Sequence, residues 1–256
     1  MTNDKMVKNK KANNWLIFIL IIVLVVLLWK IVPFFKHKSN SNPQNSQTKQ
    51  TSSAFCKKTQ PYPNPPELNS AAALVVDRIG EKLGGEKLDD RLTNWQNCLN
   101  MQYKSLPNGI EGAFIFDENS PVDNLKVFVD DDYQSYSEML RALLLSHELR
   151  HVLQFLQFKA TGVREDCVRS EVEAFESQFL FGSSLHEDER KTLAASARAN
   201  LRSEEYRPVL ELFVIHRVVK NKCGPEIGGT CYKQELDGLL TKMITSNPIY
   251  QKQCNL

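Results

Sequence analysis

Apolar residues recur at helical spacing through most of this chain, and one stretch near its middle carries the clearest pattern. The apolar positions there are three or four residues apart: Leu145, Leu149, Val152 and Leu156. This periodicity predicts an amphipathic helix. Ser135 and Glu138 have the spacing of a capping box and Gly162 is a typical stop, so we expect the helix to run from about Tyr136 to Lys159.

Similar patterns predict further helices on both sides of this one. They cover residues 68–83, a segment after Asp90, and residues 165–181, 184–202 and 207–220. Two β-like runs, Gly112 to Phe116 and Leu125 to Val129, are separated by a polar loop and should pair antiparallel. Residues 99–106 fit either the end of a helix or a strand. We therefore predict a mainly helical α+β fold with a small antiparallel sheet.

The first third of the chain has a different pattern. Residues 15–29 form an uncharged apolar run that continues after Lys30 to Phe35, which is long enough to cross about 30 Å of hydrocarbon. A signal peptide would also begin with basic residues, but no small-residue cleavage site follows, which favours an uncleaved anchor. We therefore predict a basic tail over residues 1–14, a transmembrane helix over 15–35, a flexible polar linker over 36–66 and one domain over 67–256.

The distribution of lysines around the anchor and the cysteine content both predict that this domain lies outside the cytoplasm. Four lysines precede the anchor, and three lie at or just beyond its far end (Lys30, Lys36 and Lys38), which favours a cytoplasmic N-terminus. Residues 1–53 carry a net charge of +7 in a chain of +2, so the remainder is acidic and nucleic acid is not expected as a partner.

All six cysteines follow the predicted anchor, as expected for disulfides in an oxidising compartment. Of the possible pairings, only Cys223 with Cys231 is suggested by local spacing. Six free buried thiols in a cytoplasmic domain remain the alternative.

The central helix contains the sequence His147-Glu148-Leu149-Arg150-His151. Side chains four apart on a helix lie about 5–6 Å from each other, so the two imidazoles can bind one ion, and zinc suits such ligands. Glu148 is rotated by about 100° from His147 and can act as general base on a water that the metal activates. The alternative is a surface helix that carries this pattern by chance.

This H-E-x-x-H motif resembles that of the zincin metallopeptidases. The extended metzincin pattern is absent, because Gln154 and Gln157 occupy the positions of its glycine and third histidine. The resemblance therefore implies the gluzincin branch, in which a glutamate on the next helix is the third ligand.

The predicted helix over residues 165–181 offers three glutamates for this role. Glu171 and Glu176 each lie about 70° from the centre of its apolar stripe, whereas Glu173, at about 130°, should face water. Glu171 follows His151 by twenty residues and opens an E-x-x-A sequence that resembles several membrane-associated H-E-x-x-H peptidases. Phe175 stands where that pattern often has aspartate. We predict Glu171 as the ligand, with Glu176 next.

Together these features predict a membrane-anchored zinc metallopeptidase that hydrolyses peptide bonds in a peptide or protein substrate. His147, His151 and Glu171 would hold the zinc, and His216 or Tyr206 could stabilise the oxyanion. A buried structural role is the other interpretation of His216. The alternative functions are a zinc-binding but non-catalytic interaction domain of the cell envelope and a metal-free anchored domain.

Overall fold

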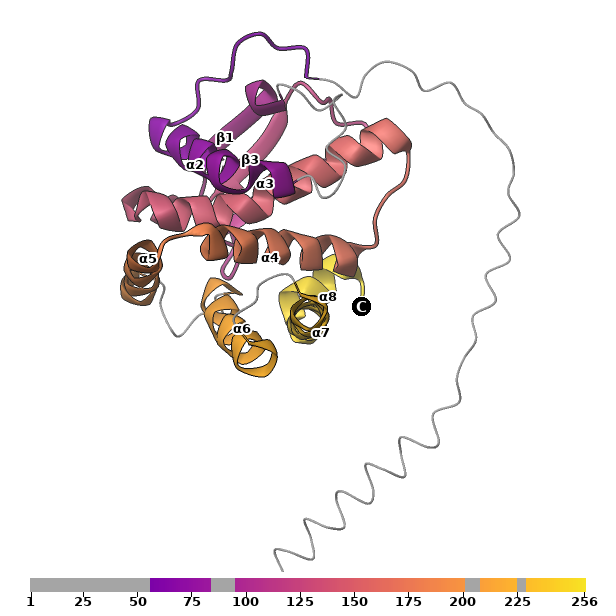
Figure 1. Ribbon diagram of the computed structural model, residues 1–256. Helices are drawn as coiled ribbons and strands as arrows, with labels where there is room; N and C mark the ends of the chain where they lie inside the picture. The colour runs from indigo at the N-terminus through magenta and orange to yellow at the C-terminus, as the bar shows by residue number, and fades with distance from the viewer. Residues whose placement is uncertain (1–55, 84–94, 201–207, 225–228) are drawn as a thin grey trace, which may run out of the picture. The chain divides into compact units, whose positions relative to one another are not determined.

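Helices account for most of the structure, which is a computed structural model that describes residues 56–83, 95–200, 208–224 and 229–256 (Figure 1). The predicted basic tail and anchor over residues 1–35 lie outside these residues, as do residues 91–94 of the helix predicted after Asp90. The described continuation of that segment, Trp95–Cys98, is a 3-10 helix. Among the helices that the structure describes, none is long and apolar enough to cross a membrane. The described part of the chain is a mainly helical α+β unit with one small sheet.

The sheet has three strands in the order β1-β3-β2: β1 (Leu99–Tyr103), β2 (Gly112–Ile115) and β3 (Leu125–Val129). β2 and β3 pair antiparallel, as predicted, with Gly112 opposite Val129. β1 pairs with the other side of β3 in parallel, so the predicted antiparallel sheet is in fact mixed. In β1, Leu99 and Met101 alternate with less buried residues and face the core, which favours a strand over the alternative helix.

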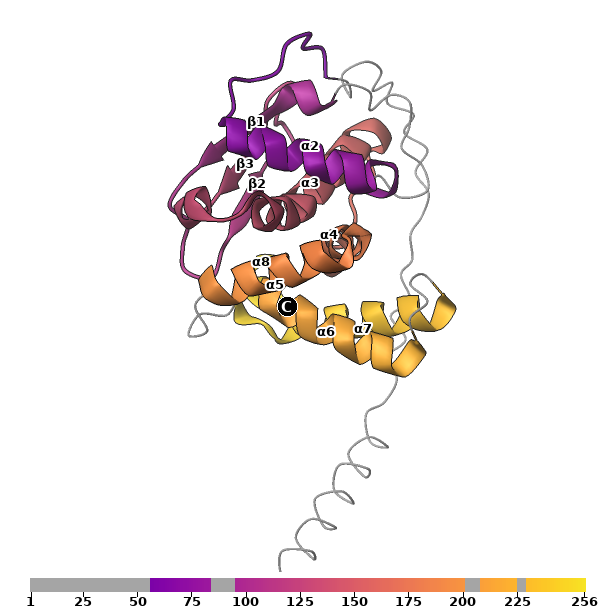
Figure 2. The same ribbon diagram turned by 60° about the vertical axis from the view of Figure 1, so that its left-hand side comes forward.

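Helix α3 (Glu138–Thr161) is the central element. Figures 1 and 2 show α3 and α4 (Cys167–Ser184) between the sheet with α2 (Pro66–Leu83) on one side and α6 (Pro208–Cys223) with α7 (Thr230–Ser246) on the other. Every residue from Leu140 to Leu149 is buried, so the predicted helix is confirmed, but this part of it is buried on all sides instead of along one apolar stripe, and the alternative of a surface helix is wrong.

The N-cap of α3 lies two residues after the predicted one, whereas its C-cap is the predicted glycine. Ser137, and not Ser135, is the N-cap, and its side chain accepts a hydrogen bond from the Leu140 N–H. Ser135 belongs to a preceding 3-10 turn over Asp131–Ser135. At the other end Gly162 has φ 72° and caps the helix as predicted, because this left-handed conformation is easily adopted only by glycine.

The rest of the described chain is also helical: α5 (Glu187–Asn200) and α6 lie where helices were predicted, and α7 and α8 (Pro248–Cys254) follow them. Before α5, the backbone N–H of His186 donates to the Glu189 carboxylate at 2.7 Å. α4 contributes to two cores. Val172, Phe175 and Phe179 pack with α6 and α7, whereas Phe181 packs with α3 and α2.

Three disulfides connect Cys56 with Cys98, Cys167 with Cys254, and Cys223 with Cys231. They include the one pair that spacing suggested, and the alternative of six free thiols is wrong. The first disulfide fastens residues 56–65, which the sequence placed in the linker. Asn64 reinforces it, because its side chain donates to the Leu99 carbonyl and accepts from the Met101 N–H along the outer edge of β1.

Candidate metal centre

Three predicted metal ligands converge between α3 and α4. His147 and His151 lie one turn apart on α3, and their Nε2 atoms are 3.1 Å from each other. Glu171 on α4 faces both: its Oε2 is 3.4 Å from His147 Nε2 and its Oε1 is 3.5 Å from His151 Nε2. In the described part of the chain, these are the residues whose geometry could hold a metal ion.

The spacing of these atoms fits a tetrahedral ion. Ligands about 2.0–2.1 Å from zinc in tetrahedral geometry stand about 3.3–3.4 Å apart. Here the two imidazole nitrogens are 3.1 Å apart and Glu171 Oε2 is 3.4 Å from that of His147, while the 3.5 Å contact with His151 is made by the other carboxylate oxygen, Oε1. Glu171 Oε2 is buried without a hydrogen-bond partner. Because a buried polar atom without a partner is costly, this oxygen is well explained as a ligand atom. The residue set therefore fits zinc, with two imidazoles and one carboxylate.

The charges of this group support one another. Burial alone would raise the pKa of Glu171, but its contacts with His147 and His151 hold that pKa below its usual range. Burial lowers the pKa of His151, and Glu171 outweighs this effect, so that the histidine pKa rises to about 9. Glu171 is thus an ionised carboxylate inside a buried site, which is the form that binds a metal, whereas the proton on His151 is one that a bound metal would displace.

Glu148 lies beside the three ligands and is directed at β2. A Cβ placed on Gly112 would be only 2.8 Å from Glu148 Oε1, so only glycine leaves room for the carboxylate. The Phe114 backbone N–H donates to this carboxylate. Burial raises the pKa of Glu148, although the nearby His147 and His151 oppose the shift. A buried carboxyl with a raised pKa is suited to accept a proton.

A cavity of about 270 Å³ joins these residues. Its walls come from residues 109–114 at β2, from α3, from Glu171, Phe175 and Gln178 on α4, and from Ile249, Tyr250 and Gln253 on α8. β2 is an edge strand, since the sheet order is β1-β3-β2. The Glu148 carboxylate therefore lies against an edge strand of the sheet.

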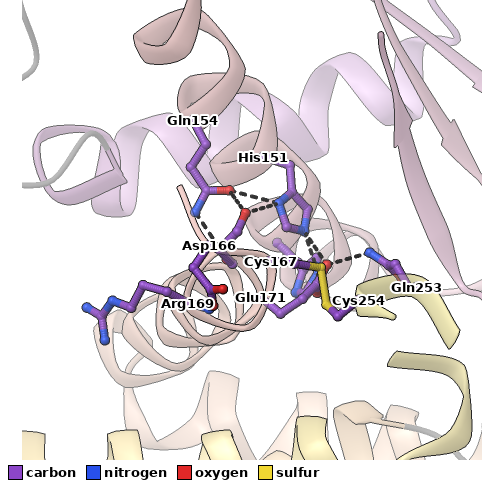
Figure 3. Close-up of a disulfide and its surroundings, with 10 residues drawn as sticks. His151, Gln154, Asp166, Cys167, Arg169, Glu171, Gln253 and Cys254 are labelled. Carbon is purple, nitrogen blue, oxygen red and sulfur yellow. Dashed lines mark hydrogen bonds and ion pairs between the residues drawn. A yellow bond between two sulfur atoms is a disulfide. The ribbon is translucent and has the colours of Figure 1, made fainter. Parts of the chain in front are cut away.

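Polar contacts around His151 hold its ring in place (Figure 3). Its Nδ1 is 2.8 Å from the Gln154 side-chain oxygen. Gln154 in turn accepts from the Ser170 hydroxyl at 2.7 Å and donates to the Ser170 carbonyl and to the Glu173 carboxylate. Sequence reasoning had used Gln154 only to exclude a metzincin, although its position one turn after His151 was a signal of this contact.

Two glutamates of α4 lie elsewhere than predicted. The side chain of Glu173 is only 14% exposed and is paired with Arg150 of α3 and with Arg169, so the prediction that it faces water is wrong. α4 packs against α3 on the side where Glu173 lies, and Arg150 compensates the buried charge. Glu176, the second candidate for the metal, instead meets Arg169 and Asp237.

His216 is not brought to this site. It lies half-buried on α6, its Nδ1 is 3.4 Å from the Tyr232 hydroxyl, and its ring packs beside Phe179. His216 and Phe179 border a different cavity of about 630 Å³, which lies between α4, α5 and α6. The structural interpretation of His216 therefore agrees with its position, and Tyr206 lies outside the described residues.

Gly112 and Gln253 are the site residues that the sequence did not indicate as such. A glycine inside a predicted strand is a known signal of close approach by another group, and it could have pointed to Gly112. Gln253 comes from the C-terminal helix, and no local pattern connects it with the motif.

No protein-family model, curated protein or solved structure matches this chain significantly.

Proposed function

We propose that this protein is a zinc metallopeptidase of gluzincin type that is anchored in the membrane and hydrolyses peptide bonds. The observation that carries the proposal is the convergence of His147, His151 and Glu171, with the ionisable Glu148 buried beside them and outside the ligand set. A purely structural zinc site would need no such neighbouring carboxylate.

Each residue has a role in this proposal. His147, His151 and Glu171 would hold zinc, which supplies a Lewis acid that polarises the scissile carbonyl and acidifies water. Glu148 accepts the proton of the attacking water at its carboxylate and returns it to the leaving amine. The Phe114 N–H and the space left by Gly112 hold this carboxylate in one position.

The edge of β2 suits an extended peptide. Addition of a strand to an open sheet edge uses backbone hydrogen bonds and leaves alternate side chains in pockets. Phe116, directly after β2, is 37% exposed and stacks on Phe114 at 5.1 Å between ring centres. Phe155 of α3 lies against both rings. This aromatic surface favours apolar side chains in the substrate.

The experiment measures zinc content and peptide hydrolysis on the purified full chain. We expect about one zinc per chain, loss of zinc in His147→Ala, and in Glu148→Gln retention of zinc with a loss of hydrolysis by orders of magnitude. Glu118→Gln is the matched control, because the Glu118 side chain is 71% exposed. Wild-type protein that binds no zinc, or a Glu148→Gln variant with full activity, would refute the proposal.

One observation favours the alternative of a zinc-binding domain that cleaves nothing. The cavity of about 270 Å³ is small, because α8 forms one of its walls. Ligand pockets usually measure about 300–1,000 Å³. Stable zinc binding without hydrolysis of any peptide in a diverse library would select this function.

A further inference from the structure

The C-terminal helix α8 reaches the candidate metal centre from the side opposite β2. The Ile249 δ-methyl lies so close to Gly109 that a Cβ there would be 2.7 Å from it, which shows that α8 contacts the loop before β2. Tyr250 packs edge-on against Phe175, with ring centres 5.7 Å apart. Together with Gln253, these α8 side chains close one side of the cavity.

The decisive contact joins Gln253 to the third ligand. Its side-chain N–H donates to Glu171 Oε1 at 2.6 Å (Figure 3). The other oxygen, Oε2, has no hydrogen-bond partner and lies 3.4 Å from His147 Nε2. A carboxylate can rotate about its last bond, and a donor on Oε1 selects the orientation in which Oε2 faces His147 while Oε1 stays 3.5 Å from His151 Nε2. Hydrogen bonds of this kind commonly orient ligating carboxylates.

A disulfide fixes α8 at this point. Cys254 directly follows Gln253, and Cys167 lies one turn before Glu171, with 5.5 Å between the two Cα atoms. α8 has only seven residues. Helices this short are not stable without tertiary contacts, so the position of Gln253 depends on what holds α8. The disulfide ties the donor to the helix that carries its acceptor.

We propose that α8 is a covalently fastened clamp for the metal centre. Gln253 is a positioning residue for Glu171, and the Cys167–Cys254 disulfide keeps it in place, so that the zinc affinity of the site depends on this disulfide. The proposal rests on the proposed zinc site. Loss of such an orienting contact typically weakens metal binding by about 10- to 100-fold.

The first test measures zinc dissociation constants for the full chain by competition with a chromophoric chelator. We expect Gln253→Leu to weaken zinc binding by about 10- to 100-fold. Gln251→Leu is the matched control, because Gln251 lies on the same helix and donates instead to the Thr245 carbonyl. Its zinc affinity and its thermal unfolding should match those of the wild type, and Gln253→Leu should differ in zinc affinity alone.

The second test asks whether the disulfide acts through Gln253. The double variant Cys167→Ser/Cys254→Ser should weaken zinc binding as much as Gln253→Leu does, and adding Gln253→Leu to it should have little further effect. Removal of Cys223–Cys231, which links α6 and α7, should leave zinc affinity unchanged.

The outcomes separate the two proposals. Wild-type zinc affinity in Gln253→Leu overturns the clamp, and so do additive effects in the combined variant. A wild-type chain that binds no zinc instead overturns the proposed function. If the serine variant does not fold, as judged by circular dichroism, the comparison of Gln253→Leu with Gln251→Leu decides alone.

Discussion

Replacing Gly112 with alanine tests whether Glu148 works from its position against β2. The added Cβ would lie 2.8 Å from Glu148 Oε1, 3.0 Å from its Cγ and 3.1 Å from its Cδ. Non-bonded carbon atoms pack at about 3.5–4.0 Å. The carboxyl group must therefore retreat by roughly 0.5–1 Å, because the β2 backbone is held in register by β3.

This displacement should affect catalysis more than stability. A misplacement of about 1 Å can cost about 100-fold in rate, whereas overpacking costs about 1–3 kcal/mol of unfolding free energy. The three atoms nearest to the new methyl group all belong to Glu148, so zinc content should stay at the wild-type level. The assay is kcat/KM on a peptide substrate, with zinc content and thermal unfolding measured on the same preparation.

Gly238→Ala is the control for Gly112→Ala. Gly238 lies inside α7 and a Cβ there meets nothing within 4 Å, so this variant should keep full activity and gain up to about 1 kcal/mol of stability. If Gly112→Ala hydrolyses peptides at the wild-type rate, Glu148 is not held against β2 during catalysis. Loss of zinc from Gly112→Ala would also contradict the separation of base and ligands.

Three further predictions concern other parts of the protein. Gln154→Leu removes the side-chain oxygen nearest to His151 Nδ1 and should weaken zinc binding about 10- to 100-fold. The control is Gln157→Leu, at an exposed position of the same helix, which should keep the wild-type zinc affinity. Equal zinc affinities of the two variants would refute the role of Gln154. Burial and the neighbouring Asp237 raise the pKa of Glu176 to about 8, so the folded state retains a proton that the unfolded state loses from about pH 4.5 upward. The unfolding free energy should fall as pH rises from about 4.5 to about 8, and chemical denaturation of Glu176→Gln should show a flatter pH profile; an unchanged profile would refute the raised pKa. Protease added outside intact cells should digest the domain, and complete protection would place it in the cytoplasm.

The sequence by itself determined the parts of the site that depend on local geometry. His147 and His151 face the same side because residues four apart on a helix always do. Gly162 ends α3 because a left-handed cap favours glycine. Glu171 was selected by its twenty-residue separation from His151 together with the resemblance of its E-x-x-A context to that of other H-E-x-x-H peptidases. It now lies within 3.5 Å of both histidines.

The tertiary structure decided which faces of each helix are buried. The single apolar stripe of α4 predicted that this helix has one buried face and that Glu173 lies on its solvent-exposed face. α4 instead packs between α3 on one side and α6 with α7 on the other, and Arg150 compensates the charge of Glu173 where it meets α3. The same packing directs Glu176 towards Asp237 and away from the metal centre. Helical periodicity describes a single helix and contains no information about its neighbours.

The remaining features depend on contacts between residues that are distant in the chain. Gln253 reaches Glu171 across 82 residues, and Cys167 pairs with Cys254 across 87. The parallel pairing of β1 with β3 likewise leaves β2 as the edge strand beside Glu148. Such contacts form only when whole helices and strands pack together to bury their apolar faces. Local sequence patterns therefore do not indicate them. Local patterns therefore determined the ligands on α3, and the packing of β2 and α8 around them determined the site.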